Sequence, residues 1–123
     1  MGEVDERITR MATVLPGGLG LRGGTCGILL GGLAAVGLRY GSTKRSERKR
    51  CGELALRVHD FFQELTRKEF GTINCRDISC CDFTNPEKAK AFIGSKAQDR
   101  CAVLLADTLR FVLPLLDDSQ TTQ

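Results

Sequence analysis

Six cysteines are the residues of this chain best suited to chemistry: Cys26, Cys51, Cys75, Cys80, Cys81 and Cys101. Cys26 ends a glycine-rich stretch, residues 17–24, and comes directly before an apolar segment. A thiol in the first turn of a helix lies near unpaired backbone N–H groups and the positive end of the helix dipole. Both favour the thiolate, which is the form that attacks disulfides and binds metals. The sequence therefore predicts an activated thiol at Cys26.

Two further cysteines are candidate partners of Cys26. Cys75 follows Asn74, a residue type that commonly caps a helix, so its thiol is also predicted at a helix start. Cys101 falls on the apolar face of the last predicted helix. Three interpretations stay open for this set: a reversible disulfide, ligation of a metal or an iron–sulfur cluster, and simple packing as small buried side chains.

The other candidate residues carry weaker signals. Cys80 and Cys81 fall in a predicted polar loop, where exposed thiols are expected and either could resolve a disulfide. Cys51 shares an apolar stripe and is predicted to pack in the core. His59 is predicted to lie at the surface, or at the boundary between surface and core, rather than to act as a ligand. With no C-x-x-C pair and one histidine, a standard structural zinc site is not encoded.

Residues 18–23 match the pattern G-x-G-x-x-G of dinucleotide-binding loops. Such a loop follows a strand, and an acidic residue comes about 20 positions later. Here the loop follows a predicted helix, and residues 39–41 read Arg-Tyr-Gly. We therefore interpret the glycines as the entry to a closely packed helix, with anion binding by loop N–H groups and Arg22 as an open alternative.

The elements that must position these residues are all predicted to be helical. Apolar residues recur at helical spacing, and no segment alternates like a strand. The predicted helices cover residues 4–15, 25–40, 51–70, 74–79, 85–94 and 96–113, of which four to five form a compact all-α bundle. The glycine-rich helix is its centre and packs against the helices at 51–70 and 96–113, with a close approach along Gly27 and Gly31.

Composition limits the classes of function. The 123 residues are 41% hydrophobic and 27% charged, which predicts one domain over residues 1–123 with a frayed tail at 117–123. A net charge of +3, no Trp and one Tyr argue against a nucleic-acid surface, and the basic residues 44–50 fit a solvated helix start. The longest uncharged stretch, residues 23–38, has 16 residues, short of the about 20 that span a bilayer. A cytoplasmic protein without a membrane segment is expected.

Four separated motifs resemble the C_GCAxxG_C_C family of putative redox-active proteins. They are Gly-Gly-Thr-Cys26-Gly27-x-x-x-Gly31-Gly32, Gly37-Leu38-Arg39-Tyr40-Gly41, Phe70-Gly71-Thr72-Ile73-Asn74-Cys75-Arg76-Asp77 and Arg100-Cys101-Ala102. The resemblance covers roughly residues 15 to 110. It implies a small helical protein in which Cys26, Cys75 and Cys101 match three of the family cysteines. The family's first cysteine lies on the N-terminal helix, where this chain has none.

These observations lead to one expected function and two alternatives. The first is a thiol-based redox or electron-transfer protein in which Cys75 or Cys101 is the partner of Cys26, and Arg22 or Arg76 adds positive potential. The second is a metal or iron–sulfur protein that uses the same three thiolates, with a homodimer to complete the ligand set. The third is a structural helical assembly domain whose cysteines only pack. A redox partner protein is expected for the first.

Overall fold

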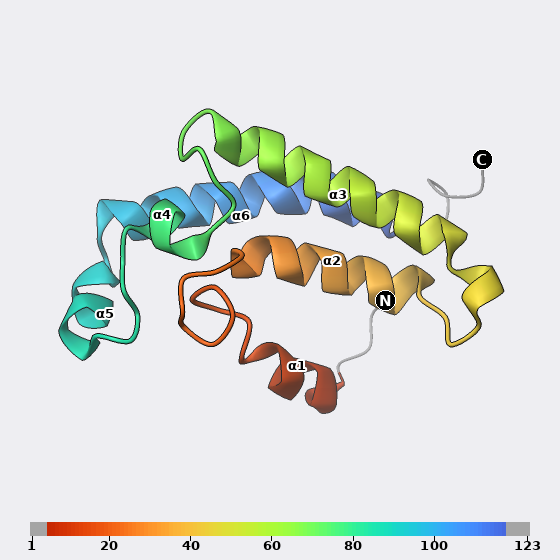
Figure 1. Ribbon diagram of the computed structural model, residues 1–123, viewed down its shortest axis with the longest axis horizontal. Coiled ribbons are helices and arrows are strands. Elements are labelled where there is room, and N and C mark those ends of the chain that lie inside the picture. The colour runs from red at the N-terminus through yellow and green to blue at the C-terminus, as the bar shows by residue number, and fades with distance from the viewer. Residues whose placement is uncertain (1–4, 118–123) are drawn as a thin grey trace.

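The computed structural model describes residues 5–117, and within them the chain forms helices and no strand (Figure 1). The elements are α1 (Glu6–Ala12), α2 (Gly27–Tyr40), a short 3-10 turn η1 (Arg45–Glu47), α3 (Lys49–Arg67), α4 (Cys75–Ser79), α5 (Pro86–Phe92) and α6 (Lys96–Leu115). This confirms the all-α prediction. Six α-helices are present in this range, and each corresponds to one of the six predicted helical segments.

Three long helices make the body of the molecule. α2 packs against α3 and α6, and α3 also packs against α6. Figure 1 shows that α3 runs opposite to α2 and α6, while α1 lies beside α2 and the short helices α4 and α5 lie at the end where α2 begins. No described helix has the length and apolar character that crossing a bilayer would require.

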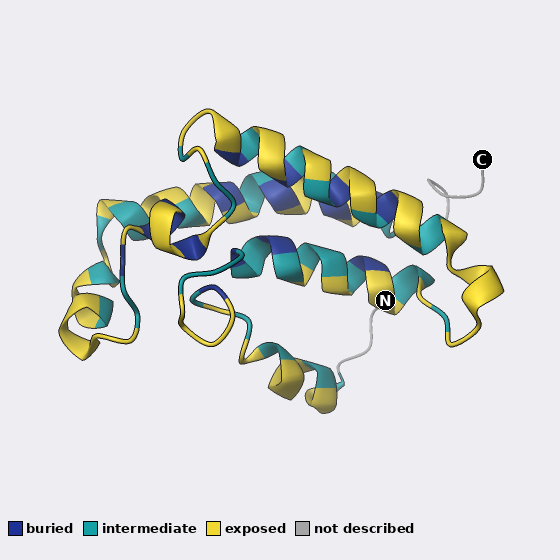
Figure 2. Cartoon of the chain, in the orientation of Figure 1, coloured by how far each residue is buried: buried dark blue, intermediate teal, exposed yellow. Residues whose placement is uncertain are grey.

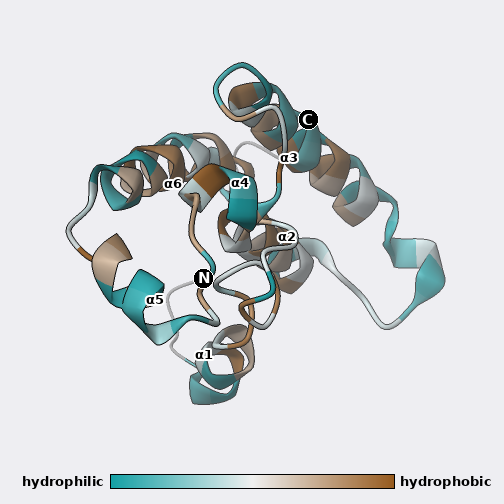
Figure 3. Ribbon diagram, turned by 60° about the vertical axis from the view of Figure 1, so that its left-hand side comes forward, coloured by the Kyte–Doolittle hydropathy of each residue, from teal (hydrophilic) through white to brown (hydrophobic). Residues whose placement is uncertain are grey.

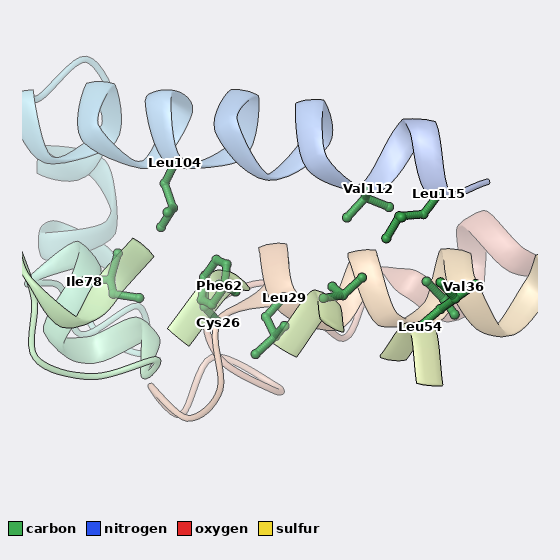
Figure 4. Packing of buried hydrophobic residues seen from close by; sticks show 10 residues of the cluster. Cys26, Leu29, Val36, Leu54, Phe62, Ile78, Leu104, Val112 and Leu115 are labelled. Atoms are coloured by element: carbon green, nitrogen blue, oxygen red, sulfur yellow. The ribbon is translucent and has the colours of Figure 1, made fainter. Parts of the chain in front are cut away.

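The core lies between these three helices, as the buried positions in Figure 2 show. α3 buries residues spaced four apart, Leu54, Val58, Phe62 and Thr66, and α6 buries Leu104, Thr108, Val112 and Leu115. This spacing places one apolar stripe of each helix against its neighbours. In Figure 4 the side chains of α6 point toward those of α2 and α3, and Phe62 and Cys26 belong to one buried cluster.

The glycines of α2 have different roles. A side chain at Gly32 would contact Val58 and Val112 at 3.4 Å, so α3 and α6 approach the helix there. A side chain at Gly27 would lie 3.2 Å from the Leu15 carbonyl oxygen. Gly31 has no neighbour within 4 Å of that position. The predicted close approach is therefore right at Gly27 and wrong at Gly31, where that face of α2 is open.

The first helix differs most from its predicted range of 4–15. α1 covers Glu6–Ala12 and buries no residue, and Met11 is 63% exposed. The Thr13 hydroxyl donates to the Arg10 carbonyl, and the chain then turns into the glycine-rich loop. Val4 and residues 118–123 of the predicted tail lie outside the described residues.

The remaining boundaries are close to their predictions. Asn85 caps α5 by accepting the N–H groups of the next turn, and α6 ends one residue after Pro114. α3 begins at Lys49, slightly before its predicted start. Residues 44–49 are exposed, and the Arg48 side chain donates to the carbonyls of the preceding loop, as expected of a solvated helix start.

Candidate functional site: a cavity lined by three thiols

The glycine-rich loop that leads to Cys26 folds upon itself. The N–H of Gly23 donates to the Gly17 carbonyl and the N–H of Gly24 donates to the Gly18 carbonyl, both at 2.9 Å. Gly18 has a φ of +77°, and a Cβ there would lie 2.5 Å from the backbone of Gly24. Because these N–H groups already have backbone acceptors, the loop does not offer them as a phosphate cradle. This agrees with the interpretation of the motif as a helix entry.

A short backbone pairing brings Cys26 and Cys75 together. Thr25 and Asn74 form an isolated antiparallel bridge, in which Cys26 N–H donates to Ile73 O at 2.8 Å and Cys75 N–H donates to Gly24 O at 2.6 Å. In such a pairing the two cysteines are diagonal neighbours on one face, which typically lie about 7–8 Å apart between Cα atoms. Disulfides need about 7 Å or less between Cα atoms, so this typical spacing lies close to the limit for a disulfide.

This arrangement corrects the predicted start of α2 at Thr25 and the predicted helix cap at Asn74. Thr25 takes part in the bridge, and Cys26 itself is the N-cap residue of α2, with no capping hydrogen bond from its side chain. The Asn74 side chain makes no capping bond to α4, and the Asn74 N–H donates to the Thr72 hydroxyl. Tertiary pairing has replaced the local caps that the residue types predicted.

All three predicted thiols line one cavity of about 480 Å³ that is open to solvent. Cys26 and Cys75 enter it from the bridge, and Cys101 enters it from α6. The remaining wall is almost entirely apolar, with residues from α1, the glycine-rich loop, α2, the chain around Phe83, α5 and α6. Figure 3 shows these helices gathered around the start of α2. We call this space, lined by Cys26, Cys75 and Cys101, the thiol cavity.

The protonation of the thiols differs from the prediction. Burial raises the pKa of Cys26, and the nearby N–H groups of Ile28 and Leu29 only partly offset that effect. Burial also raises the pKa of Cys75, against a lowering by the Ser79 hydroxyl. The pKa of Cys101 rises to about 11, first through burial and then through its proximity to Cys26 and Cys75. The expectation of a thiolate at the positive end of α2 is therefore wrong, because loss of hydration outweighs the helix dipole.

The arginines near the site are only partly those predicted. Arg76 donates to the Arg22 carbonyl at 3.3 Å, and both side chains are on the exposed side of the loop, outside the cavity wall. Arg100 is the cation that lowers the pKa of Cys101. Sequence reasoning missed this role, although Arg100 is the chain neighbour of Cys101. It also missed Ser79, whose position four residues after Cys75 on a helix was the available signal.

The weaker candidates are placed as follows. Cys80 is exposed, and its backbone adopts the left-handed conformation at the end of α4, with a φ of +55°. Cys81 is buried, and its sulfur lies 3.6 Å from the Lys88 carbonyl oxygen. The prediction of two exposed thiols is therefore wrong for Cys81. Cys51 packs against the core as predicted. His59 is half-buried beside Asp60, with 3.6 Å between Nδ1 and the carboxylate, which agrees with a boundary residue.

A metal ion needs several ligand side chains that converge on one point. Among residues 5–117, no three His, Cys, Asp or Glu side chains form a group able to hold a metal ion. The described part of one chain does not gather the ligand set, and a cluster shared between two copies stays a prediction.

The raised thiol pKa values predict that stability falls in alkaline solution. Above pH 9.0, the ordinary thiol pKa, the unfolded chain loses thiol protons that the folded chain retains, so the free energy of unfolding decreases as pH rises toward about 11. Cys101→Ser is expected to reduce this decrease. Urea unfolding of both chains across pH 9 to 11 measures the difference, in which the titration of lysines and tyrosine cancels. Identical pH dependence of the two chains would contradict the raised pKa of Cys101.

Comparison with known proteins identifies the family of this chain. No curated protein and no solved structure matches the chain. The profile of one protein family, described as "Putative redox-active protein (C_GCAxxG_C_C)", matches residues 1–115. Since that match covers nearly the whole chain, the protein belongs to the C_GCAxxG_C_C family of putative redox-active proteins.

Proposed function

We propose that this protein is a thiol-based redox protein whose working couple is a reversible disulfide between Cys26 and Cys75. The observation that supports this pairing is the Thr25–Asn74 bridge, which holds the two cysteines as diagonal neighbours on one face. In the oxidation, the two thiols lose two protons and two electrons, and one S–S bond forms. The electrons pass to an acceptor, which is itself reduced by two electrons.

The apolar surroundings favour a role as electron donor. A low thiol pKa stabilises the reduced state and makes a disulfide strongly oxidising. In this protein burial raises the pKa of both thiols, so the reduced state lacks that stabilisation. The couple therefore lacks the feature that makes a disulfide strongly oxidising, which supports a role for the dithiol as an electron donor. Cys101 in the same cavity is placed to exchange with the pair.

Equilibration with mixtures of reduced and oxidised dithiothreitol tests this couple. The chain is expected to lose two of its six free thiols reversibly, with Cys26 and Cys75 joined in the peptide map. Cys26→Ser and Cys75→Ser are each expected to abolish this disulfide. The matched control is Cys51→Ser, which removes a cysteine of the core and leaves the couple intact.

Two outcomes would overturn the proposal. One is a chain whose six thiols all stay reduced across the range of mixtures. The other is a Cys75→Ser variant that still forms a Cys26 disulfide with Cys101 as readily as the parent chain, which would move the couple to that pair.

A further inference from the structure

The size of the thiol cavity and its uncharged lining limit the kinds of molecule that can reach its sulfurs. The volume of about 480 Å³ is within the range of about 300–1,000 Å³ that is usual for small-molecule sites. None of its lining residues carries a charge, and the polar groups in the wall are the thiols and the Ser79 hydroxyl, which donates to the Cys75 carbonyl at 2.7 Å. An anionic or cationic group would enter this wall without a partner and would lose its hydration.

The burial of the thiols favours a compact molecule over a protein surface. Cys26 is 6% exposed and Cys75 is 9% exposed, so little of either residue is available to a disulfide on the surface of a partner protein. Aromatic rings of Phe83 and Phe92, packed edge to face at 5.0 Å between centroids, form one side of the cavity. Leu105 of α6 contributes to the same wall and is 44% exposed.

From this geometry we infer that the thiol cavity takes an uncharged, largely apolar small molecule as its oxidising substrate and excludes charged ones. The inference rests on the proposed function, since the substrate must react with the Cys26–Cys75 couple. For a small disulfide the step is balanced as follows. The Cys26 sulfur, as thiolate, attacks one substrate sulfur, the substrate S–S bond breaks, and one substrate thiol leaves.

The second half of the reaction completes the exchange. The Cys75 sulfur attacks the Cys26 sulfur of the mixed disulfide, and the second substrate thiol leaves. The substrate disulfide is reduced to two thiols, the protein dithiol is oxidised to one disulfide, and the two thiol protons pass to the leaving thiols or to water. Each substrate molecule therefore releases two thiols when the couple works and one when it does not.

Two aromatic disulfides of opposite character provide the probe: dithiodipyridine, which is uncharged near neutral pH, and dithiobis(nitrobenzoate), which is a dianion. For each reagent, the rate of reaction with Cys26 and Cys75 in the folded chain is divided by the rate in the urea-unfolded chain. This ratio removes the difference in intrinsic reactivity between the two reagents. After this correction, dithiodipyridine is expected to react faster by about tenfold or more. Equal corrected rates would overturn the inference.

A pair of lysine substitutions on α6 makes the test specific to the cavity. Leu105→Lys places a cation in the wall and is expected to reduce the preference for dithiodipyridine by about fivefold or more. Leu109→Lys adds the same charge one turn later, at a leucine that is 43% exposed and outside the cavity wall, and is expected to leave the preference within about twofold. Equal effects of the two lysines would show that net charge, not the cavity, sets the preference, and would also overturn the inference.

The same experiment separates this inference from the proposed function. A clear preference for dithiodipyridine with only one thiol released per substrate would support the apolar site and contradict the Cys26–Cys75 couple. Release of two thiols from both reagents at equal corrected rates would support the couple and contradict the apolar site.

Discussion

Gly18→Ala is expected to destabilise the glycine-rich loop strongly and to expose Cys26. Gly18 has a φ of +77°, and the added methyl carbon would lie 2.5 Å from the N and O atoms of Gly24. Real side chains do not come so close to backbone, so the segment that carries Cys26 must move. The left-handed conformation alone costs about 1–2 kcal/mol for a residue with a Cβ. The displacement of Gly24 adds to this cost, and the Gly24 carbonyl is the acceptor of the Cys75 N–H.

The matched control for this substitution lies two residues away. Gly20 is also left-handed, with a φ of +64°, but a Cβ there would have no neighbour within 4 Å. Gly20→Ala therefore carries the conformational cost alone. Urea unfolding is expected to show a larger decrease in the free energy of unfolding for Gly18→Ala than for Gly20→Ala. Alkylation by iodoacetamide is expected to label Cys26 faster in Gly18→Ala only. Equal losses and equal labelling in both variants would contradict the role given to the Gly18–Gly24 contact.

Phe62→Ala is expected to lower the free energy of unfolding by about 3–5 kcal/mol. Phe62 is fully buried and is the largest such side chain among the described residues. Its removal leaves a cavity between α3 and the neighbouring helices, because the surrounding core relaxes only in part. Typical domains are stable by about 5–15 kcal/mol, so this one substitution would remove a large share of the total.

The neighbouring aromatic residue provides the comparison. Phe61 is only partly buried and stacks on Phe111, with 4.1 Å between ring centroids. Phe61→Ala is expected to be less destabilising, because solvent already reaches this position and no enclosed cavity forms. Chemical denaturation of the two variants under the same conditions measures the difference. If Phe61→Ala lowered the free energy of unfolding as much as Phe62→Ala, the assignment of Phe62 to the core and Phe61 to its edge would be contradicted.

Much of the fold follows from local pattern. The stripe that contains Leu54, Val58 and Phe62 predicted both the course of α3 and the face that it buries. Asn85 with Pro86, and Gly41, marked helix ends that the structure places there. These features depend on residues near one another in the chain, so periodicity and capping preferences suffice to predict them.

The candidate site could be predicted only in part from local sequence patterns. The sequence grouped Cys26, Cys75 and Cys101 as candidate partners, and the structure shows that all three line one cavity. The sequence predicted a lowered thiol pKa at Cys26, whereas burial raises it. A helix start is visible in sequence, whereas the loss of water around a sulfur depends on α1, α5 and α6, which come from distant parts of the chain. The backbone bridge at Thr25 and Asn74 had no local signal either, since neither segment alternates like a strand.

The Thr25–Asn74 bridge also has a consequence for motion. It closes a loop that contains all of α2 and α3. Only three backbone hydrogen bonds join the two segments, because the Arg76 N–H also donates to the Gly23 carbonyl at 3.3 Å, whereas the three-helix body has a buried apolar core. Regions with few apolar contacts open at lower free energy than the core of the same protein. Partial opening at the bridge therefore separates the two sulfurs while the three helices stay folded. Access to the reactive sulfurs is then a property of the native ensemble, set by how often these three hydrogen bonds break together.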